Sequence, residues 1–211
     1  MMGMQGTGSH HVVATELTIP SHRLAAGTDP SETSDADDGS RTLYCGAPLV
    51  GGFASYAVAV GAARGALDLY EELLRTRKWL VPPFPLRFEM PEFQLAFGNA
   101  QALVDTAEAA LFALADRVTA QTQTALEQSM SVPLEDVKRT HRAGLQCIEL
   151  AWQATDLIFR TSGSSSAASD AALGRVFRGL AVVRTHIGAQ PDPVSINVSR
   201  LHFGLPPVSP L

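Results

Sequence analysis

Two side chains of this 211-residue chain combine reactive chemistry with a position at a predicted helix end. His186 carries an imidazole, which suits proton transfer because its ordinary pKa lies near neutrality. Its position alone favours a simpler interpretation, in which the ring interacts with the helix dipole. Arg77 offers paired N–H donors to a phosphate, or it completes a basic helix end together with Arg75 and Lys78. Each residue therefore has both a functional and a structural interpretation.

Two short runs of glycine and hydroxyl residues are further candidates. Thr7 and Ser9 belong to a GTGS sequence whose amides and hydroxyls could contact a phosphate, although glycines near a terminus commonly provide only flexibility. Ser164 and Ser165 follow Gly163 at a predicted helix end, where a C-cap and a loop are the simple interpretation. These four hydroxyls acquire a functional interpretation only from their context.

The histidines and cysteines do not form a metal or redox pattern. His10, His11 and His22 have no carboxylate or second histidine at the i,i+4 spacing of a ligand pair, so we predict no metal site. Cys45 and Cys147 lie about a hundred residues apart without a CxxC motif, which fits a reducing cytoplasm. Neither a GxSxG sequence nor a P-loop is present, so hydrolase and nucleotide-triphosphatase interpretations have no support.

The composition predicts one main domain that associates with itself. The chain has a mass of 22.4 kDa, with 45% hydrophobic and 18% charged residues. An average soluble domain has about 25% charged residues, so we expect surface hidden in a homo-oligomer, either a dimer or a tetramer. The net charge of −5 and the scattered basic residues argue against nucleic-acid binding.

Neither export nor membrane insertion is expected from the sequence. The start, MMGMQGTGSHH, lacks the basic and apolar regions of a signal peptide, so we expect a cytoplasmic protein. Residues 42–63 are uncharged and reach membrane-spanning length. Pro48 and several glycines dilute their hydrophobicity, however, and the pattern continues past Arg64 into a charged amphipathic stretch. We therefore interpret this segment as part of a helix in a soluble bundle.

Four segments have the pattern of amphipathic helices, which predicts a mainly α protein. Residues 91–127 are the best example, because apolar residues recur there at alternating steps of four and three. The predicted helices span 48–77, 91–127, 131–160 and 170–186. We expect a four-helix up-and-down bundle, with the proline-rich tail from Ile187 lying across it without a helical period.

A short β segment is predicted before the bundle. Residues 9–19 are rich in β-branched residues and stop at Pro20, which indicates a strand or two. The domain prediction is therefore a β segment, an acidic linker, and a bundle with its tail, spanning 1–23, 24–46 and 47–211.

Three stretches together resemble the acyl-CoA dehydrogenase superfamily. GTGSHHVVATELTIPSHR is similar to the end of its β-domain, and the predicted helices match its helical domain in number and order. ELLRTRKW resembles the segment that contributes a flavin-phosphate arginine across a subunit interface, a role this resemblance implies for Arg77. SGSSSAASDAALGRVFRGLAVVRTH resembles the glycine-serine, Arg-x-x-Arg-Asp and His stretch of flavin-dependent monooxygenases with this fold.

The monooxygenase resemblance implies an activity and roles for particular residues. Such two-component enzymes, including 4-hydroxyphenylacetate-type hydroxylases, use reduced FMN or FAD from a separate flavin reductase. His186 would assist substrate deprotonation or stabilise the oxygen-activated flavin, while Ser164 and Ser165 would lie beside the flavin. The chain departs from the pattern at Arg178-Gly179, where the family has Arg-Asp. It also begins almost at the GTGS turn, after roughly half of a family member.

Three hypotheses follow. The leading one is hydroxylation of an aromatic or polyketide-like small molecule, with a separate N-terminal chain or oligomerisation completing the pocket. The second is a flavin-free relic that cyclises or dehydrates a hydrophobic intermediate, with His186 as acid or base. The third is a non-catalytic helical subunit that stabilises a full-length homologue through the small residues of the first helix.

Overall fold

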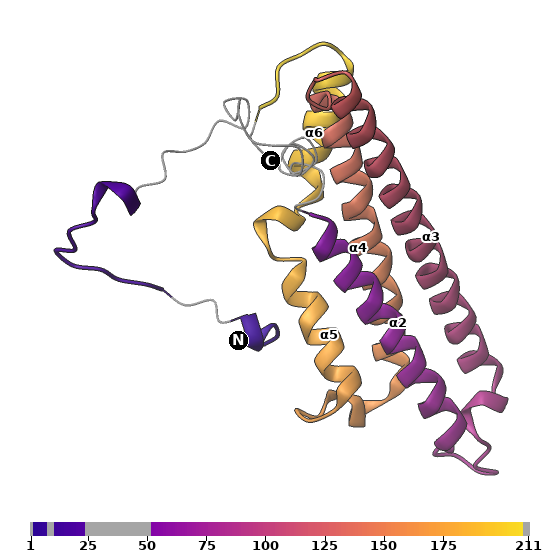
Figure 1. Cartoon of the computed structure of the whole chain (residues 1–211). Helices are drawn as coiled ribbons and strands as arrows, with labels where there is room; N and C mark the ends of the chain where they lie inside the picture. Colours follow the sequence, from indigo (N-terminus) through magenta and orange to yellow (C-terminus); the bar gives the residue numbers. More distant parts are fainter. Residues whose placement is uncertain (1, 8–10, 24–51, 209–211) are drawn as a thin grey trace.

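The protein is mainly helical, as expected. The computed structural model describes residues 2–7, 11–23 and 52–208. Within these ranges the α-helices are α2 (Phe53–Thr76), α3 (Pro91–Glu127), α4 (Leu134–Ser162), α5 (Ala172–Val183) and α6 (Pro191–His202). Helices α2 to α5 run alternately down and up, and α6 continues beyond the upper end of α5 (Figure 1).

The predicted four-helix bundle is not confirmed, because the described ranges contain five helices arranged around α4. This helix packs against each of the others, while α5 packs against α2 and α4, and α6 packs against α4. The small-residue face of α2 makes the close packing possible, since Ala59, Ala63 and Ala66 have no exposed surface. At Gly144 of α4 an added Cβ would overlap the ring of Tyr56, so a glycine is needed at this contact.

The ends of the long helices follow local sequence signals. α3 begins with Pro91, which lacks the N–H that a first helical residue would leave unpaired. α4 begins at Leu134 after Pro133 and carries Glu135 in its first turn, where a negative charge interacts favourably with the helix dipole. It ends before Gly163, whose φ of 95° is a conformation that glycine adopts readily.

The C-terminal tail departs from the prediction, because it forms the helix α6. Its prolines occupy the first turn, where they are compatible with a helix, with Pro191 as the first residue. Val194 and Asn197 are buried against the bundle, and the Asn197 side chain accepts a hydrogen bond of 2.9 Å from the amide of Val208. The two prolines therefore start a helix here and do not prevent one.

The predicted β segment is not confirmed in the described part of residues 9–19. Residues 11–20 form no strand, and Val12 and Val13 are 92% and 86% exposed. A strand is stabilised by hydrogen bonds to a neighbouring strand, and none of the described residues forms one beside this segment. The predicted acidic linker, 24–46, lies outside the described residues. No helix within the described ranges has the length and apolar character needed to cross a membrane.

Candidate functional site

Arg77 and the serine-rich turn meet at the lower end of the bundle. Arg77 follows α2 in an extended conformation, and its Nη1 donates a hydrogen bond to the hydroxyl of Ser165. Ser165 lies in the 3-10 helix η4 (Ser164–Ala167), directly after α4. Arg77, Ser164 and Ser165 are exposed. Three of the predicted site residues are thus brought into one region, although 88 positions separate Arg77 from Ser165.

A second arginine, which the sequence analysis did not identify, supports this turn from inside. Arg87 begins the 3-10 helix η3 (Arg87–Glu89) and is only 7% exposed. Its Nη1 donates a hydrogen bond of 2.7 Å to the carbonyl of Ser162, and its guanidinium lies 5.3 Å from the ring centroid of Phe93. The sequence could have indicated this role, because Arg87 lies within the apolar sequence PFPLRF and a cation in such surroundings needs a specific partner.

Among the described residues, no acidic group forms an ion pair that neutralises the positive charge of the two arginines, Arg77 and Arg87. Burial, followed by the charge of Arg77, lowers the pKa of Arg87 from its ordinary value. The exposed Arg77 guanidinium and the Ser165 hydroxyl are donors that fit a phosphate group, and the buried Arg87 adds positive charge behind them.

The serine-rich turn is tightly packed against the start of α5. Ser166 is buried, and a Cβ added at Gly174 would overlap its carbonyl oxygen. Arg178, the second arginine of the sequence motif, donates from Nη2 to the carbonyl of Ser169 at 3.0 Å. These contacts hold the backbone around Ser164 and Ser165 in place.

The structure places His186 at the other end of α5, so it does not adjoin Arg77 or Ser165. The twelve residues of α5 span about 18 Å at the rise of an α-helix. His186 is exposed and caps the 3-10 helix η5 (Ile187–Ala189), with its Nδ1 accepting a hydrogen bond of 3.1 Å from the amide of Gly188. His186 and the arginine pair therefore form two separate candidate regions.

Of the remaining predicted residues, Thr7 and Cys147 are described by the structure and Ser9 is not. Thr7 is exposed in the 3-10 helix η1 (Gln5–Thr7), where its hydroxyl donates to the carbonyl of Met4 at 2.9 Å. Ser9 lies outside the described residues. Cys147 is buried, and among the described residues there is no group of three or more histidine, cysteine and acidic side chains that could hold a metal ion.

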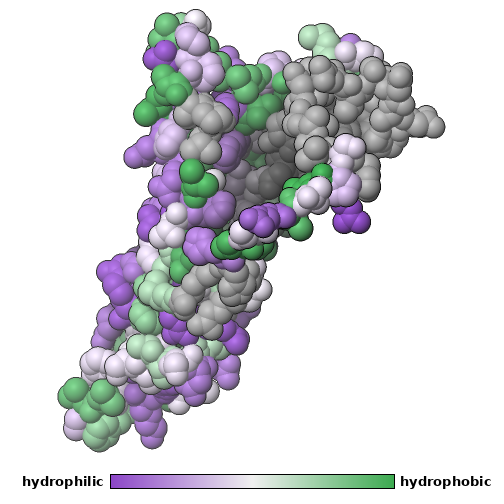
Figure 2. All heavy atoms as spheres, turned by 90° about the vertical axis from the view of Figure 1, so that its left-hand side faces the viewer, coloured by the Kyte–Doolittle hydropathy of each residue, from purple (hydrophilic) through white to green (hydrophobic). Residues whose placement is uncertain are grey.

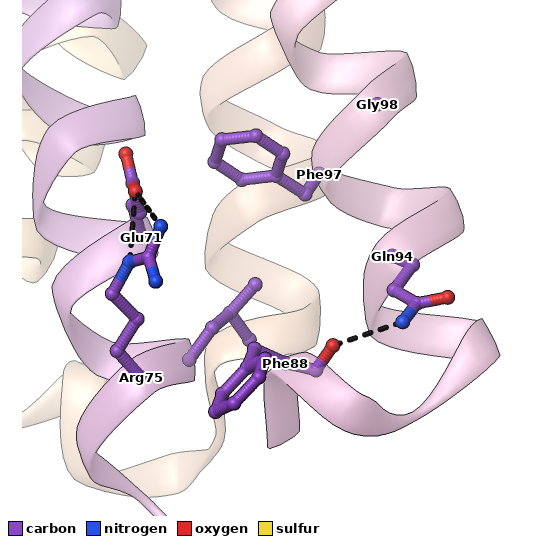
Figure 3. A pocket seen from close by; sticks show the side chains of 7 residues that line it. Glu71, Arg75, Phe88, Gln94, Phe97 and Gly98 are labelled. Carbon is purple, nitrogen blue, oxygen red and sulfur yellow. Dashed lines mark hydrogen bonds and ion pairs between the residues drawn. The ribbon is translucent and has the colours of Figure 1, made fainter. Parts of the chain in front are cut away.

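An apolar hollow of about 210 Å³ lies between α2 and α3, close to η3 (Figure 3). Phe88 and Phe97 line it, and the ion pair between Glu71 and Arg75 lies on its α2 side, with 2.7 Å between the charged atoms. Ligand pockets usually have about 300–1,000 Å³. None of the predicted site residues lines the hollow, and we assign no substrate to it.

Exposed apolar side chains gather at the lower tip of the bundle (Figure 2). The connection between α2 and α3 exposes Leu80, Val81 and Phe84 there. Backbone hydrogen bonds stiffen this tip, including 2.8 Å from the amide of Trp79 to the carbonyl of Pro85. The apolar tip, defined by Leu80, Val81 and Phe84, directly adjoins Arg77 and Arg87 along the chain.

Comparisons with known proteins identify the fold. The family described as "Acyl-CoA dehydrogenase, C-terminal domain" matches residues 53–191. A pigment production hydroxylase from Rhodococcus sp. (strain ATCC 21145) is 27% identical over 216 residues, which cover 99% of this chain and 53% of the hydroxylase.

Two solved structures extend the comparison. The crystal structure of 3-HSA hydroxylase from Rhodococcus sp. RHA1 matches this chain with a TM-score of 0.78 and 23% sequence identity. XiaF from Streptomyces sp., in complex with FADH2 and glycerol, matches with a TM-score of 0.75 and 21% sequence identity. Each match covers 99% of this chain and 52% of the other. The chain therefore spans about half the length of each of these three proteins.

Proposed function

Because the chain belongs to the family of acyl-CoA dehydrogenase C-terminal domains, we propose that it is the helical part of a flavin-dependent monooxygenase. The proposed reaction is hydroxylation of an aromatic or polyketide-like small molecule. The names of the pigment production and 3-HSA hydroxylases and the FADH2 bound to XiaF support this proposal. The cationic group of Arg77, Arg87 and Ser165 is the observation that carries it, because it matches the phosphate end of a flavin.

The chain's own residues would bind the cofactor and position it. Arg77 and Ser165 would donate hydrogen bonds to the phosphate, with Ser164 beside them and Arg87 holding the end of α4. When bound, reduced FMN or FAD supplies electrons and activates dioxygen. We propose that a separate reductase provides it, and that a separate N-terminal chain or oligomerisation completes the pocket. Thr7 and Ser9 remain proposed contacts of the GTGS turn.

His186 is the proposed group for proton transfer or hydrogen bonding at the substrate. The length of α5 separates His186 from the serine-rich turn that Arg77 contacts. We propose that a flavin whose phosphate lies at Arg77 and a substrate that reaches His186 belong to different active sites of an oligomer. The family resemblance likewise implies that Arg77 binds the flavin phosphate of a neighbouring subunit. We therefore propose a homo-oligomer.

Flavin binding tests the proposed function. The full-length native protein is titrated with reduced FMN and with reduced FAD under anaerobic conditions. Arg77→Gln is expected to weaken binding about 10- to 100-fold, because charge-assisted hydrogen bonds contribute about 1.5–3 kcal/mol. Arg75→Gln is the matched control, since Arg75 is bonded to Glu71 and is expected to leave the affinity unchanged.

Two outcomes would contradict the proposal. Equal flavin affinity of the Arg77→Gln variant and the unaltered protein would remove the phosphate assignment. No binding of either flavin would remove the monooxygenase function and favour the non-catalytic helical subunit.

A further inference from the structure

A second histidine, His141, is linked to the proposed catalytic histidine through one glycine. The amide of Gly188 donates to Nδ1 of His186 at 3.1 Å. The carbonyl of the same glycine lies 3.4 Å from Nε2 of His141, which projects from α4 and is half-buried beside the ring of Tyr56. Gly188 is therefore held on both sides by imidazole rings.

The direction of these hydrogen bonds determines where each ring carries its proton. An amide N–H can only donate, so Nδ1 of His186 is the unprotonated nitrogen and the neutral ring carries its proton at Nε2. A carbonyl can only accept, so Nε2 of His141 is protonated. Burial lowers the pKa of His141, the bond to Gly188 opposes this change and the charge of Lys138 adds to it.

The polar and charged side chains around the loop after α5 do not compete for the hydrogen bonds of His186 and His141 with Gly188. The Gln190 side chain donates to the carbonyls of Arg184 at 2.8 Å and of His186 at 3.3 Å, which closes the loop after α5. The Arg184 guanidinium is paired with Glu149 at 3.1 Å and lies over the Trp152 ring. It is therefore engaged by other groups.

We infer that His186 presents an N–H at Nε2 and acts on the substrate as a hydrogen-bond donor to an anionic or carbonyl oxygen, such as that of a phenolate. The neutral ring so held has no lone pair at Nε2 with which to remove a proton. His141 is a positioning residue, because it fixes the glycine that sets the proton of His186. The inference rests on the proposed function for the role of His186, but the hydrogen bonds themselves can be measured independently.

Nitrogen NMR of the protein labelled with 15N tests the hydrogen bonds directly. At a pH where both rings are neutral, His186 is expected to show an unprotonated Nδ1 and a protonated Nε2. A scalar coupling across the hydrogen bond between the Gly188 amide nitrogen and Nδ1 of His186 is also expected. A proton on Nδ1 of His186 would overturn the inference whatever the activity of the protein.

The positioning role of His141 has its own measurement. His141→Phe is expected to speed hydrogen exchange of the Gly188 amide at least tenfold, and His141→Gln, which keeps a donor, is expected to restore its protection. His202→Phe is the control, because His202 lies at the end of α6 and is exposed. Unchanged exchange in His141→Phe would overturn the positioning role.

Turnover separates a donor from a base. Glutamine places an amide N–H near the position of Nε2 but cannot take up a proton, so His186→Gln is expected to keep at least a tenth of kcat. His186→Ala is expected to lose at least 100-fold. Equal losses in the two variants would overturn the donor role. Normal turnover in His186→Ala, with the NMR result as expected, would overturn the proposed catalytic role of His186 and leave the hydrogen-bond assignment standing.

Discussion

A buried guanidinium without a carboxylate partner costs free energy unless other groups interact with its charge. Arg87 obtains that compensation from the Ser162 carbonyl and the face of the Phe93 ring. Arg64, by contrast, is paired with both Asp105 and Glu108. Two carboxylates therefore neutralise the charge of Arg64, whereas no ion pair among the described residues neutralises the charge of the buried Arg87.

The buried imidazole of His141 predicts a dependence of stability on pH. Its pKa in the folded protein is below the ordinary value of about 6.5, mainly because of burial. Below about pH 6.5 the unfolded chain therefore binds a proton that the folded protein does not yet bind, so stability falls as the pH falls toward the lower pKa. His141→Gln is expected to reduce this loss between about pH 7 and pH 5, measured by urea unfolding. An identical pH dependence in both proteins would contradict the prediction.

A single glycine, Gly144, allows helices α2 and α4 to pack closely. Gly144 is buried where α4 meets α2, and its missing side chain makes room for the Tyr56 ring. Gly98 of α3 is exposed, and a Cβ added there would meet nothing within 4 Å. The two positions share residue type and helical conformation but differ in the space around them.

This difference predicts opposite effects of the same substitution. Gly144→Ala is expected to destabilise the protein by about 1–3 kcal/mol, because the added methyl group overlaps the Tyr56 ring. Gly98→Ala is expected to stabilise it by about 0.5–1 kcal/mol, because alanine loses less backbone entropy in a helix. Urea unfolding with an unchanged m-value measures both. Similar shifts for the two variants would show that helix propensity alone controls these positions.

Helices with a sustained pattern could be predicted from the sequence, whereas elements that depend on contacts could not. The predicted 91–127 coincides with α3, because its apolar residues repeat over the whole length and Pro91 marks its start. α6 was missed because only its packing reveals that Pro191 starts a helix. The β segment is not confirmed, because β-branched residues form a strand only beside a partner strand and none of the described residues provides one.

The candidate site shows the same division. Arg77 contacts Ser165 although 88 positions separate them in the sequence, and both remain proposed site residues. The sequence spacing could not reveal the buried role of Arg87 or the length of α5 between Ser165 and His186, because both depend on how the helices pack.

At the scale of the whole molecule, the apolar tip and the adjoining arginines lie where a partner subunit is expected. Leu80, Val81 and Phe84 are 80%, 55% and 50% exposed, and they extend from the end of α2 that carries Arg77. If a second copy supplies the rest of a flavin site at Arg77, its surface would cover this tip and remove the apolar side chains from water.

Sedimentation over a range of concentrations is therefore expected to show assemblies of at least two chains. Replacing Leu80 and Phe84 by serine is expected to raise the dissociation constant about 100-fold or more, because burying such a side chain contributes about 1.5–3 kcal/mol. Phe203→Ser is the control, since Phe203 is 74% exposed beyond α6 at the opposite end. Association of the tip variant equal to that of the unaltered protein would contradict the prediction.

Linkage between flavin and assembly gives the last prediction. If flavin contacts Arg77 of one chain and the remainder of its site on another, flavin binds the assembly more tightly than the single chain. Reduced flavin must then strengthen association by the same factor, because the two equilibria share one coupling free energy. Arg77→Gln is expected to abolish this effect of flavin while the apolar tip still supports association in its absence. Flavin binding without any change in association would place the whole flavin site within one chain.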